Sequence, residues 1–415
     1  MSPSIWDLFS TADFRTIFLA LISVGLSLAF AFPAAVSVFR WIVSRVRLQL
    51  ILRKENLHAC NTSDSKIDVS VSGLFVHPVK SMRSISLSES TLDRKGLTGD
   101  RRFMVVYELP LPVYKKNWGQ GDTTHRFLTQ RQCPSLATIS ATMDDSKSER
   151  VLVLEQKSST SGKHPSTTII RIPLTNKSHP QLSSNQRHLA GIWDDVVAVE
   201  DMGDDAAAFL QAIADADDEL SASTLGGSKK VVRLVTESTT SPLPPMGTDD
   251  RSYVPGYAKT WTGGFLGKPT LTDGFPILIA SEASLEALNE KLVEGGKEAI
   301  PMSRFRPNIV VKGTSLTPFE EDRWKVVAIG DTVFAIVKAC PRCKQSCTDQ
   351  TTGTVSPEME PVETMKSFRR SLGNQPSNGD VFFAQNAIPI GKLEGKTIRV
   401  GDSVRILETG DPVYK

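Results

Sequence analysis

Three of the five cysteines of this chain fall within eight residues, as Cys340, Cys343 and Cys347. Basic residues stand beside them at three positions, Lys338, Arg342 and Lys344. Positive charge close to a cysteine favours the thiolate, which is the form that ligates metals and attacks electrophiles. The segment is therefore the first candidate for chemistry.

Four interpretations of this segment are open. A structural zinc site needs four ligands, usually two separated pairs, but no His or Cys follows Cys347 and the nearest upstream cysteine is Cys133. A Cys-x-x-Cys redox pair belongs at a helix N-terminus, whereas the pattern here predicts a strand and then a loop. The cysteines also fit three ordinary buried thiols. The fourth interpretation is a thiolate bound to a soft metal centre.

Basic residues also lie near predicted turns elsewhere in the chain. Lys80-Ser81 follows Pro78, Arg101-Arg102 follows Asp100, and Arg304 and Arg306 precede Pro307-Asn308. Taken singly, each fits a solvated surface charge. Taken together, they are the donors that a phosphate needs, with Arg as a bidentate fork and Lys as a point charge. The spacing does not show whether they converge.

Short β-branched and aromatic runs bounded by turn residues predict the strands that must position these groups. The runs are 72–76, 102–107, 136–143, 150–154, 168–172, 230–235, 305–311, 324–329, 333–338 and 397–407. Helical periodicity predicts helices over 204–220, 281–294 and 363–372, and polar stretches predict long loops over 156–190 and 236–270. This pattern predicts an α+β, β-rich fold with barrel-like sheets and added helices.

A Gly-Asp pair between β-branched residues occurs twice, in 329–333 (IGDTV) and in 400–404 (VGDSV). Such a pair is typical of a tight connection between strands. We expect the two turns at both ends of one sheet.

Composition narrows the class of protein. Lys and Arg total 48 against 46 Asp and Glu, a net charge of +2, which gives no electrostatic reason to expect nucleic-acid binding. Five cysteines in 415 residues do not form the dense framework of a small secreted protein, so a reducing compartment is expected.

Residues 17–39 carry no charge and form a run of 23 residues. As a helix this run is long enough to cross about 30 Å of hydrocarbon. One basic residue precedes it and five follow it (Arg15; Arg40, Arg45, Arg47, Arg53 and Lys54), which predicts an anchor whose C-terminal side faces the cytosol. A cleaved signal peptide is the alternative. Residues 40–70 are then a linker.

Several stretches resemble the MOSC-domain family, in particular its mitochondrial amidoxime-reducing members. In order, they are Val79-Lys80-Ser81, Asp100-Arg101-Arg102-Phe103, Ser281 to Leu285, Arg304 to Val310, and Cys340-Pro341-Arg342-Cys343. The resemblance runs from about residue 72 to 407. It implies an N-terminal β-barrel-like domain over 71–235 and a MOSC β-barrel domain over 236–410. Gln350 and Thr351 depart from the family pattern, which has Pro and Asp there.

The resemblance implies a molybdenum–molybdopterin cofactor with Cys343 as the metal ligand. The matching cofactor-binding positions are Lys80, Ser81, Arg102, Gly274, Phe275, Arg306, Asn308, Pro341 and Arg342. Asp349 is the acid nearest to Cys343 in sequence, so it is a candidate proton donor. The alternative for Asp349 is a turn-capping role ahead of Thr351 and Gly353.

The function implied by the resemblance is reduction of N-hydroxylated compounds such as amidoximes and hydroxylamines. Electrons are expected from cytochrome b5 and NADH-cytochrome b5 reductase, because no haem or flavin motif is visible. The expected location is the mitochondrial outer membrane facing the cytosol, with the endoplasmic reticulum as the alternative. Two other functions are open: a non-catalytic cofactor-binding or sulfur-carrier MOSC protein, and a cofactor-free membrane scaffold.

Overall fold

The computed structural model describes residues 68–412 together with residues 42, 43, 46 and 50. Within 68–412 it leaves out 94, 114–122, 145–149, 158–166, 175–186, 194, 223–229, 239–253, 255–270, 371–378 and 392. Among the described residues, no helix is both long and apolar enough to cross a membrane. The anchor predicted over 17–39 and most of the linker predicted over 40–70 lie outside the described residues.

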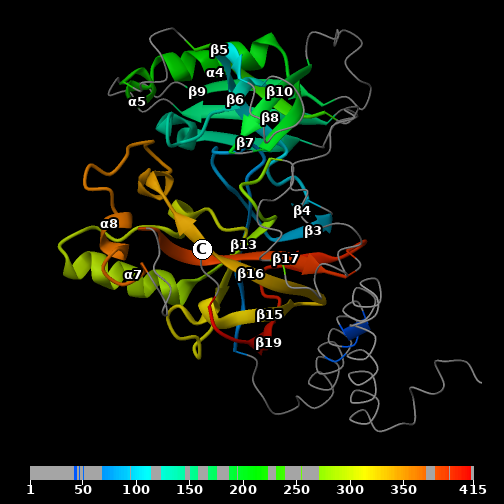
Figure 1. The fold of residues 1–415 in the computed structure, drawn as a ribbon, viewed down its shortest axis with the longest axis vertical. Helices are drawn as coiled ribbons and strands as arrows, with labels where there is room; N and C mark the ends of the chain where they lie inside the picture. Colours follow the sequence, from blue (N-terminus) through cyan, green and yellow to red (C-terminus); the bar gives the residue numbers. More distant parts are fainter. Residues whose placement is uncertain are drawn as a thin grey trace, which may run out of the picture. The chain divides into compact units, whose positions relative to one another are not determined.

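One part of the fold is a closed five-stranded barrel, in the order β10-β11-β12-β5-β6 (Figure 1). Its strands are β5 (Phe103–Val113), β6 (Thr123–Phe127), β10 (Arg187–Ile192), β11 (Asp195–Asp201) and β12 (Val232–Glu237). A separate three-stranded sheet joins β7 (Ile139–Asp144), β8 (Val151–Lys157) and β9 (Thr167–Pro173). The short helix η1 (Pro134–Thr138) leads into β7.

Strand β5 shows why this region folds as a barrel. Its side chains alternate between two cores, as expected for a strand with a two-residue period. Met104 and Val106 pack in one cluster with residues of β6, β10, β11 and β12, while Val105 packs in another with β7, β8 and helix α4 (Asp204–Asp215). Helix α4 is followed by α5 (Asp218–Ala222). The helix predicted over 204–220 is therefore confirmed, with a break after residue 215.

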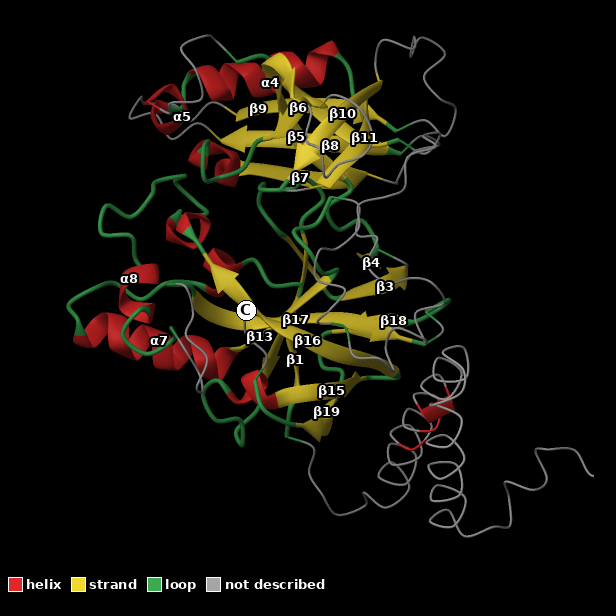
Figure 2. Cartoon of the chain, viewed as in Figure 1, coloured by secondary structure: helices red, strands yellow, loops and turns green. Residues whose placement is uncertain are grey.

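The second part is an eight-stranded sheet in the order β19-β15-β16-β17-β13-β14-β1-β2 (Figure 2). Its strands are β1 (Ser70–Val76), β2 (Ile85–Leu87), β13 (Ile277–Ser281), β14 (Ile309–Lys312), β15 (Trp324–Ile329), β16 (Thr332–Arg342), β17 (Val381–Ile390) and β19 (Val404–Thr409). A small sheet pairs β18 (Thr397–Arg399) with β3 (Glu89–Asp93) and β4 (Gly96–Leu97). Strand β1 pairs with β14 and β3 with β18, so the first strands of the predicted domain 71–235 share sheets with strands of the predicted domain 236–410.

Helix α7 (Glu282–Glu294) packs on β13 and β14 (Figure 1). Its buried residues Leu288 and Leu292 enter a cluster with Phe305 and Phe383, which confirms the helix and the apolar face predicted from the spacing. Ser281 occupies the N-cap position, but its side chain makes no capping hydrogen bond. Four short helices complete the described elements: η4 (Met302–Phe305), η5 (Glu320–Arg323), η6 (Lys344–Cys347) and α8 (Val362–Met365).

Predicted boundaries differ from the structure at several places. The strand predicted over 136–143 begins only at Ile139, because Pro134–Thr138 form the short helix η1. The strand predicted over 305–311 begins only at Ile309, because Arg306 has a left-handed backbone with a φ of 54° and Pro307 follows it. The run 397–407 divides into β18 and β19 around Gly401, which has a φ of 92°. The helix predicted over 363–372 is the single turn α8, and residues 371–378 are not described.

The two Gly-Asp turns lie against each other rather than at opposite ends of a sheet. Gly330 connects β15 and β16 with a φ of 55°, and its N–H donates to Ser403 O at 3.0 Å. A β-carbon on Gly330 would lie 3.0 Å from Asp402 Oδ2, so the close approach of the second turn favours glycine. Ile329 pairs with Val404, which brings both turns to one end of the β15–β19 pair.

Candidate functional site

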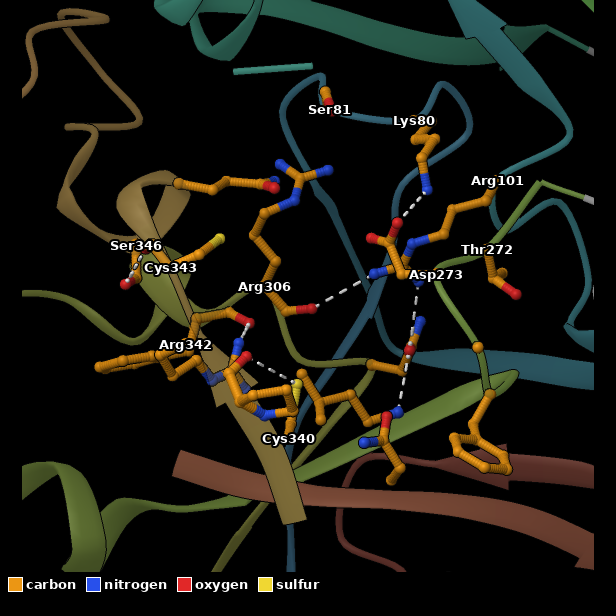
Figure 3. Close-up of a pocket in the computed structure, with 18 of the residues that line it drawn as sticks. Lys80, Ser81, Arg101, Thr272, Asp273, Arg306, Cys340, Arg342, Cys343 and Ser346 are labelled. Carbon is orange, nitrogen blue, oxygen red and sulfur yellow. Dashed lines mark hydrogen bonds and ion pairs between the residues drawn. The ribbon is translucent and has the colours of Figure 1, made fainter. Parts of the chain in front are cut away.

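A cavity of about 390 Å³ collects residues from both parts of the fold (Figure 3). Seven Lys or Arg side chains line it against two Asp side chains. The cations are Lys80, Arg101, Arg131, Arg304, Arg306, Lys338 and Arg342, and the acids are Asp273 and Asp380. A concave site with this excess of positive charge attracts an anionic ligand.

Cys343 presents its sulfur to this cavity just beyond the end of β16. The pairing of β16 with β17 is irregular at two places close to the cysteines, between Ile336 and Lys338 and between Ala339 and Pro341. Bulges of this kind commonly redirect side chains beside active sites. The Nε of Arg131 donates to Cys343 Sγ at 3.0 Å, so a fixed positive charge lies next to the sulfur.

Arg342 precedes Cys343 and holds the cavity wall together. Its Nε and Nη2 donate to Phe383 O at 2.9 and 2.6 Å, and its Nη1 donates to Phe305 O at 3.0 Å. The guanidinium also lies 5.3 Å from the centre of the Phe305 ring. These contacts tie the Cys343 segment to β17 and to helix η4.

Arg306 is the cation whose surroundings most favour the binding of an anion. Its side chain is buried, and Nη1 donates to Met82 O at 2.6 Å, while Nη2 has no hydrogen-bond partner among the residues that the structure describes. Burial, with Arg101 nearby, lowers the pKa of Arg306 below its ordinary value. A buried donor without an acceptor is costly, so an anion placed against Nη2 would be favoured. Figure 3 draws this side chain between Cys343 and Lys80.

Lys80 is a buried cavity residue that contacts the segment 271–275. Its Nζ donates to Asp273 Oδ1 at 2.6 Å and to Leu271 O at 3.1 Å. Burial lowers the pKa of Lys80, and the ion pair with Asp273 opposes this shift. The indole N–H of Trp193 donates to the same Asp273 oxygen at 2.9 Å. Thr272, next to Asp273, has a buried hydroxyl without a partner in the described residues.

Left-handed backbone conformations concentrate at this cavity. The described residues include seven non-glycine residues with positive φ, and four of them line the cavity: Ser81, Arg101, Trp193 and Arg306. Such conformations cost about 1–3 kcal/mol each, and they persist where the surrounding structure enforces them. Their clustering marks the cavity as a functional site rather than a packing gap.

A buried pair of amides lies under the cavity floor. Gln130 Nε2 donates to Gln350 Oε1 at 3.0 Å, and Gln350 Nε2 donates back to Gln130 Oε1 at 2.9 Å. Gln130 also donates to Ser81 O at 2.7 Å, and Gln350 Oε1 accepts from Arg306 Nη1 at 3.3 Å. The pair therefore joins three segments that carry cavity residues.

The structure brings together most of the residues singled out in the sequence. Eight of the nine predicted cofactor-binding residues line the cavity, as does Cys343: Lys80, Ser81, Gly274, Phe275, Arg306, Asn308, Pro341 and Arg342. Arg102 is outside it, because its Nη2 pairs with Asp93 at 2.5 Å. The neighbouring Arg101 lines the cavity instead, and its left-handed backbone separates the directions of the two side chains.

Asp349, the candidate proton donor, does not line the cavity. Its Oδ1 accepts from the backbone N–H groups of Thr351 and Thr352 at 2.8 and 2.9 Å, and its Oδ2 pairs with Arg304 at 3.2 Å. These contacts match the turn-capping alternative. Cys347 is also turned away from the cavity, since it is fully buried and donates to Met359 O at 3.1 Å. Burial raises the pKa of Cys347 to about 11.

Sequence reasoning missed Arg131, Trp193, Asp273 and Thr272. Arg131 stands between Gln130 and Gln132, and nothing in that spacing links it to a cysteine more than two hundred residues away. In the described part of the chain, no group of three or more His, Cys, Asp or Glu side chains is placed to hold a metal ion. Among the described residues, the cavity offers the Cys343 thiol in a cationic setting, a second thiol at Cys340, and buried donors without hydrogen-bond partners such as Arg306 Nη2. Those residues fit an anionic group that takes a soft sulfur ligand.

Comparison with known families accounts for both parts of the fold. The MOSC N-terminal beta barrel domain matches residues 68–217, and the MOSC domain matches residues 267–405. The chain belongs to the MOSC-domain family.

Relatives within this family carry two kinds of name. Mitochondrial amidoxime reducing component 2 of Bos taurus is 27% identical over 349 residues, which are 83% of this chain and 82% of the relative. Mitochondrial amidoxime-reducing component 1 of Mus musculus is 38% identical over 143 residues, 33% of this chain and 38% of the relative. A molybdenum cofactor sulfurase of Botryotinia fuckeliana is 25% identical over 376 residues, 83% of this chain and 42% of the relative.

Proposed function

We propose that the cavity binds a molybdenum–pterin cofactor and that this MOSC protein reduces N-hydroxylated compounds. The observation that carries the proposal is the position of Cys343. Its sulfur faces a cavity lined by seven cations, in which the buried Nη2 of Arg306 lacks an acceptor within the described parts of the chain. A pterin cofactor with a phosphate and a soft metal supplies the anion and the sulfur-binding centre that these groups suit.

The chain's own residues divide into two roles under this proposal. Cys343 supplies the thiolate ligand, with Arg131 beside it at 3.0 Å. Lys80, Arg101 and Arg306 would hold the phosphate and the pterin, since all three line the cavity. Lys80 is already paired with Asp273 and Arg101 with Asp100, whereas no acid is paired with Arg306 among the described residues. The bound cofactor would supply two-electron redox chemistry at the metal, and the protein supplies orientation and charge.

The proposed substrates are amidoximes and hydroxylamines. Cleavage of the N–O bond consumes two electrons and two protons, and it releases the reduced nitrogen compound and water. The names of the amidoxime reducing components among the relatives support this substrate class. Two acids line the cavity among the described residues, and Asp273 is paired with Lys80. Asp380 therefore replaces Asp349, which lies outside the cavity, as the candidate proton donor.

The electron donors, the anchor and the location belong to the same proposal. Cytochrome b5 and its NADH-dependent reductase would deliver electrons through a small, polar, short-lived contact. The uncharged run at 17–39 would anchor the protein with its body in the cytosol, in the mitochondrial outer membrane or, as the alternative, in the endoplasmic reticulum. The word "mitochondrial" in the names of the relatives favours the first location.

The test is metal and pterin content of the full-length protein from a host that makes the cofactor. Wild type should carry near-stoichiometric molybdenum and reduce an amidoxime with chemically supplied electrons. Cys343→Ser should lose the activity and most of the metal. Cys340→Ser is the matched control, since Cys340 lines the same cavity three residues away. A wild type with zinc, or with neither metal nor pterin, would refute the proposal.

A second candidate is cofactor binding without turnover, as a carrier of the cofactor or of sulfur. The relative named molybdenum cofactor sulfurase favours it. Here the wild type would contain molybdenum and pterin but would not reduce amidoximes or hydroxylamines. The same preparation therefore separates the two functions.

A further inference from the structure

Cys343 is contacted by a side chain from the N-terminal part of the chain. Arg131 follows β6 of the barrel, and its Nε donates to Cys343 Sγ at 3.0 Å. We propose that Arg131, seated on Trp193, is a positioning residue that fixes the Cys343 sulfur and sets the charge around the metal it would bind. This inference rests on the proposed function and gives the barrel a direct role in the site.

Trp193 is the platform that determines where the Arg131 charge lies. The guanidinium carbon of Arg131 is 4.3 Å from the centre of the Trp193 ring, a close cation–π contact. The planar guanidinium can stack on the indole and still direct an N–H at the sulfur, which a lysine ammonium cannot do with the same geometry. The choice of arginine on tryptophan therefore suits a fixed direction rather than charge alone.

Trp193 is itself held by contacts from three sides. It follows β10 in the connection to β11, and its backbone is left-handed with a φ of 54°. A bulky residue with positive φ is uncommon and points to an enforced position. Its indole N–H donates to Asp273 Oδ1 at 2.9 Å, and its ring packs edge-on against Phe127 at 5.2 Å between centroids.

Asp273 extends the chain of contacts to the proposed phosphate end of the cavity. The same oxygen that accepts from Trp193 also pairs with Lys80 at 2.6 Å. A continuous set of contacts thus runs from Cys343 through Arg131, Trp193 and Asp273 to Lys80. Arg131 and Trp193 lie in loops of the barrel, whereas Asp273 and Lys80 lie outside it, so this network links the barrel and the sulfur end to the anion end of the cavity.

A residue that acts through the thiolate should change the electronic properties of the metal, not only the stability of the fold. Removing the positive charge of Arg131 makes reduction of the bound metal less favourable. The midpoint potential of Arg131→Gln should therefore be more negative than that of wild type. Loss of a partner that orients a metal ligand typically costs about 10–100-fold in metal affinity or activity. We expect that loss in kcat or in cofactor retention, with a smaller change in KM.

The experiment compares full-length, cofactor-loaded variants by molybdenum content, redox titration of the paramagnetic metal signal and steady-state kinetics. Arg131→Gln should shift the potential and the signal. Arg131→Lys should keep the midpoint potential closer to that of wild type, because lysine retains the positive charge. It should still alter the paramagnetic signal, because lysine lacks the planar guanidinium. Trp193→Ala should follow Arg131→Gln, and Trp193→Phe, which keeps an aromatic platform, should change less. Arg171→Gln is the control, since Arg171 is exposed and pairs with Asp144.

The outcomes separate the two proposals. A wild type that lacks molybdenum refutes the proposed function and this inference with it. A loaded wild type and a loaded Arg131→Gln with the same potential, signal and kcat overturn the role of Arg131 and leave the proposed function intact. If Arg131→Gln does not fold, Arg131→Lys and Trp193→Ala decide the question, and wild-type behaviour in both overturns the inference.

Discussion

Replacing Gln350 by Leu should destabilise the protein and loosen the anion end of the cavity. The Gln350 side chain takes part in four hydrogen bonds: with Gln130 in both directions, with Thr348 O, and with Arg306 Nη1. Gln130 takes part in three, of which two are the bonds it shares with Gln350. At about 0.5–1.5 kcal/mol for each bond, Gln350→Leu should cost about 2–6 kcal/mol and Gln130→Leu somewhat less.

The two changes should not be additive, because they remove the same two bonds. The double variant should therefore lose about 1–3 kcal/mol less stability than the sum of the losses in the two single variants. Denaturant unfolding of full-length wild type, both single variants and the double variant measures this coupling, and pterin content of each shows the effect on the cavity. Additivity to within about 0.5 kcal/mol would mean that the amide pair is not formed, and the account of how Arg306 is held would fail.

Three further predictions concern residues at and away from the cavity. Arg101→Gln should lower cofactor content about tenfold or more, because Arg101 lines the cavity. Arg102→Gln should leave the cofactor content unchanged, because Arg102 pairs with Asp93 outside the cavity. Equal losses in the two variants would contradict the placement of these two side chains. Asp349→Asn should reduce the free energy of unfolding by about 1 kcal/mol and leave turnover unchanged, because Asp349 caps a turn. A loss of turnover in a folded Asp349→Asn variant would make Asp349 the proton donor again. Burial, with Asp322 nearby, raises the pKa of Glu321 to about 7. The folded protein therefore binds more protons at this site than the unfolded chain between the unfolded pKa and 7, so stability should fall by on the order of 3 kcal/mol as pH rises through that range. Urea midpoints against pH should show this decline in wild type and lose it in Glu321→Gln, and the same slope in both would contradict the assignment.

Much of the fold follows from local pattern in the sequence. The β15 and β16 strands, the apolar face of α7 and the tight turn at Gly330 depend on residues close together in the chain, so periodicity and turn chemistry predict them. The extent of β16 was underestimated, because it runs on through Pro341 at a bulge that no local rule foresees. The lengths of short helices such as α8 depend on packing against other segments and not on propensity.

Site residues that belong to a sequence motif could be predicted, whereas those that reach the cavity only through tertiary contacts could not. Resemblance indicated Cys343, Lys80 and Arg306, all of which the structure places at one cavity. It did not separate Arg101 from Arg102, because adjacent residues share a motif and only the backbone conformation at Arg101 decides which one faces inward. Arg131 and Trp193 are joined to the cysteine only by tertiary contacts, so no spacing could reveal them.

Strand β1 has a consequence for how the site is made. It is among the earliest described segments to leave the ribosome, yet Val71 pairs with Val311, and its other neighbour in the sheet is β2. Strand β1 therefore cannot pair with β14, in the sheet that carries the cysteine strand, until some 240 further residues have been synthesised. Contacts this distant in sequence slow folding. A chain cut between the barrel and the second half would separate β1 and β3 from their partners β14 and β18. The cavity also needs residues of β17, so a cofactor can be captured only after that strand has been synthesised.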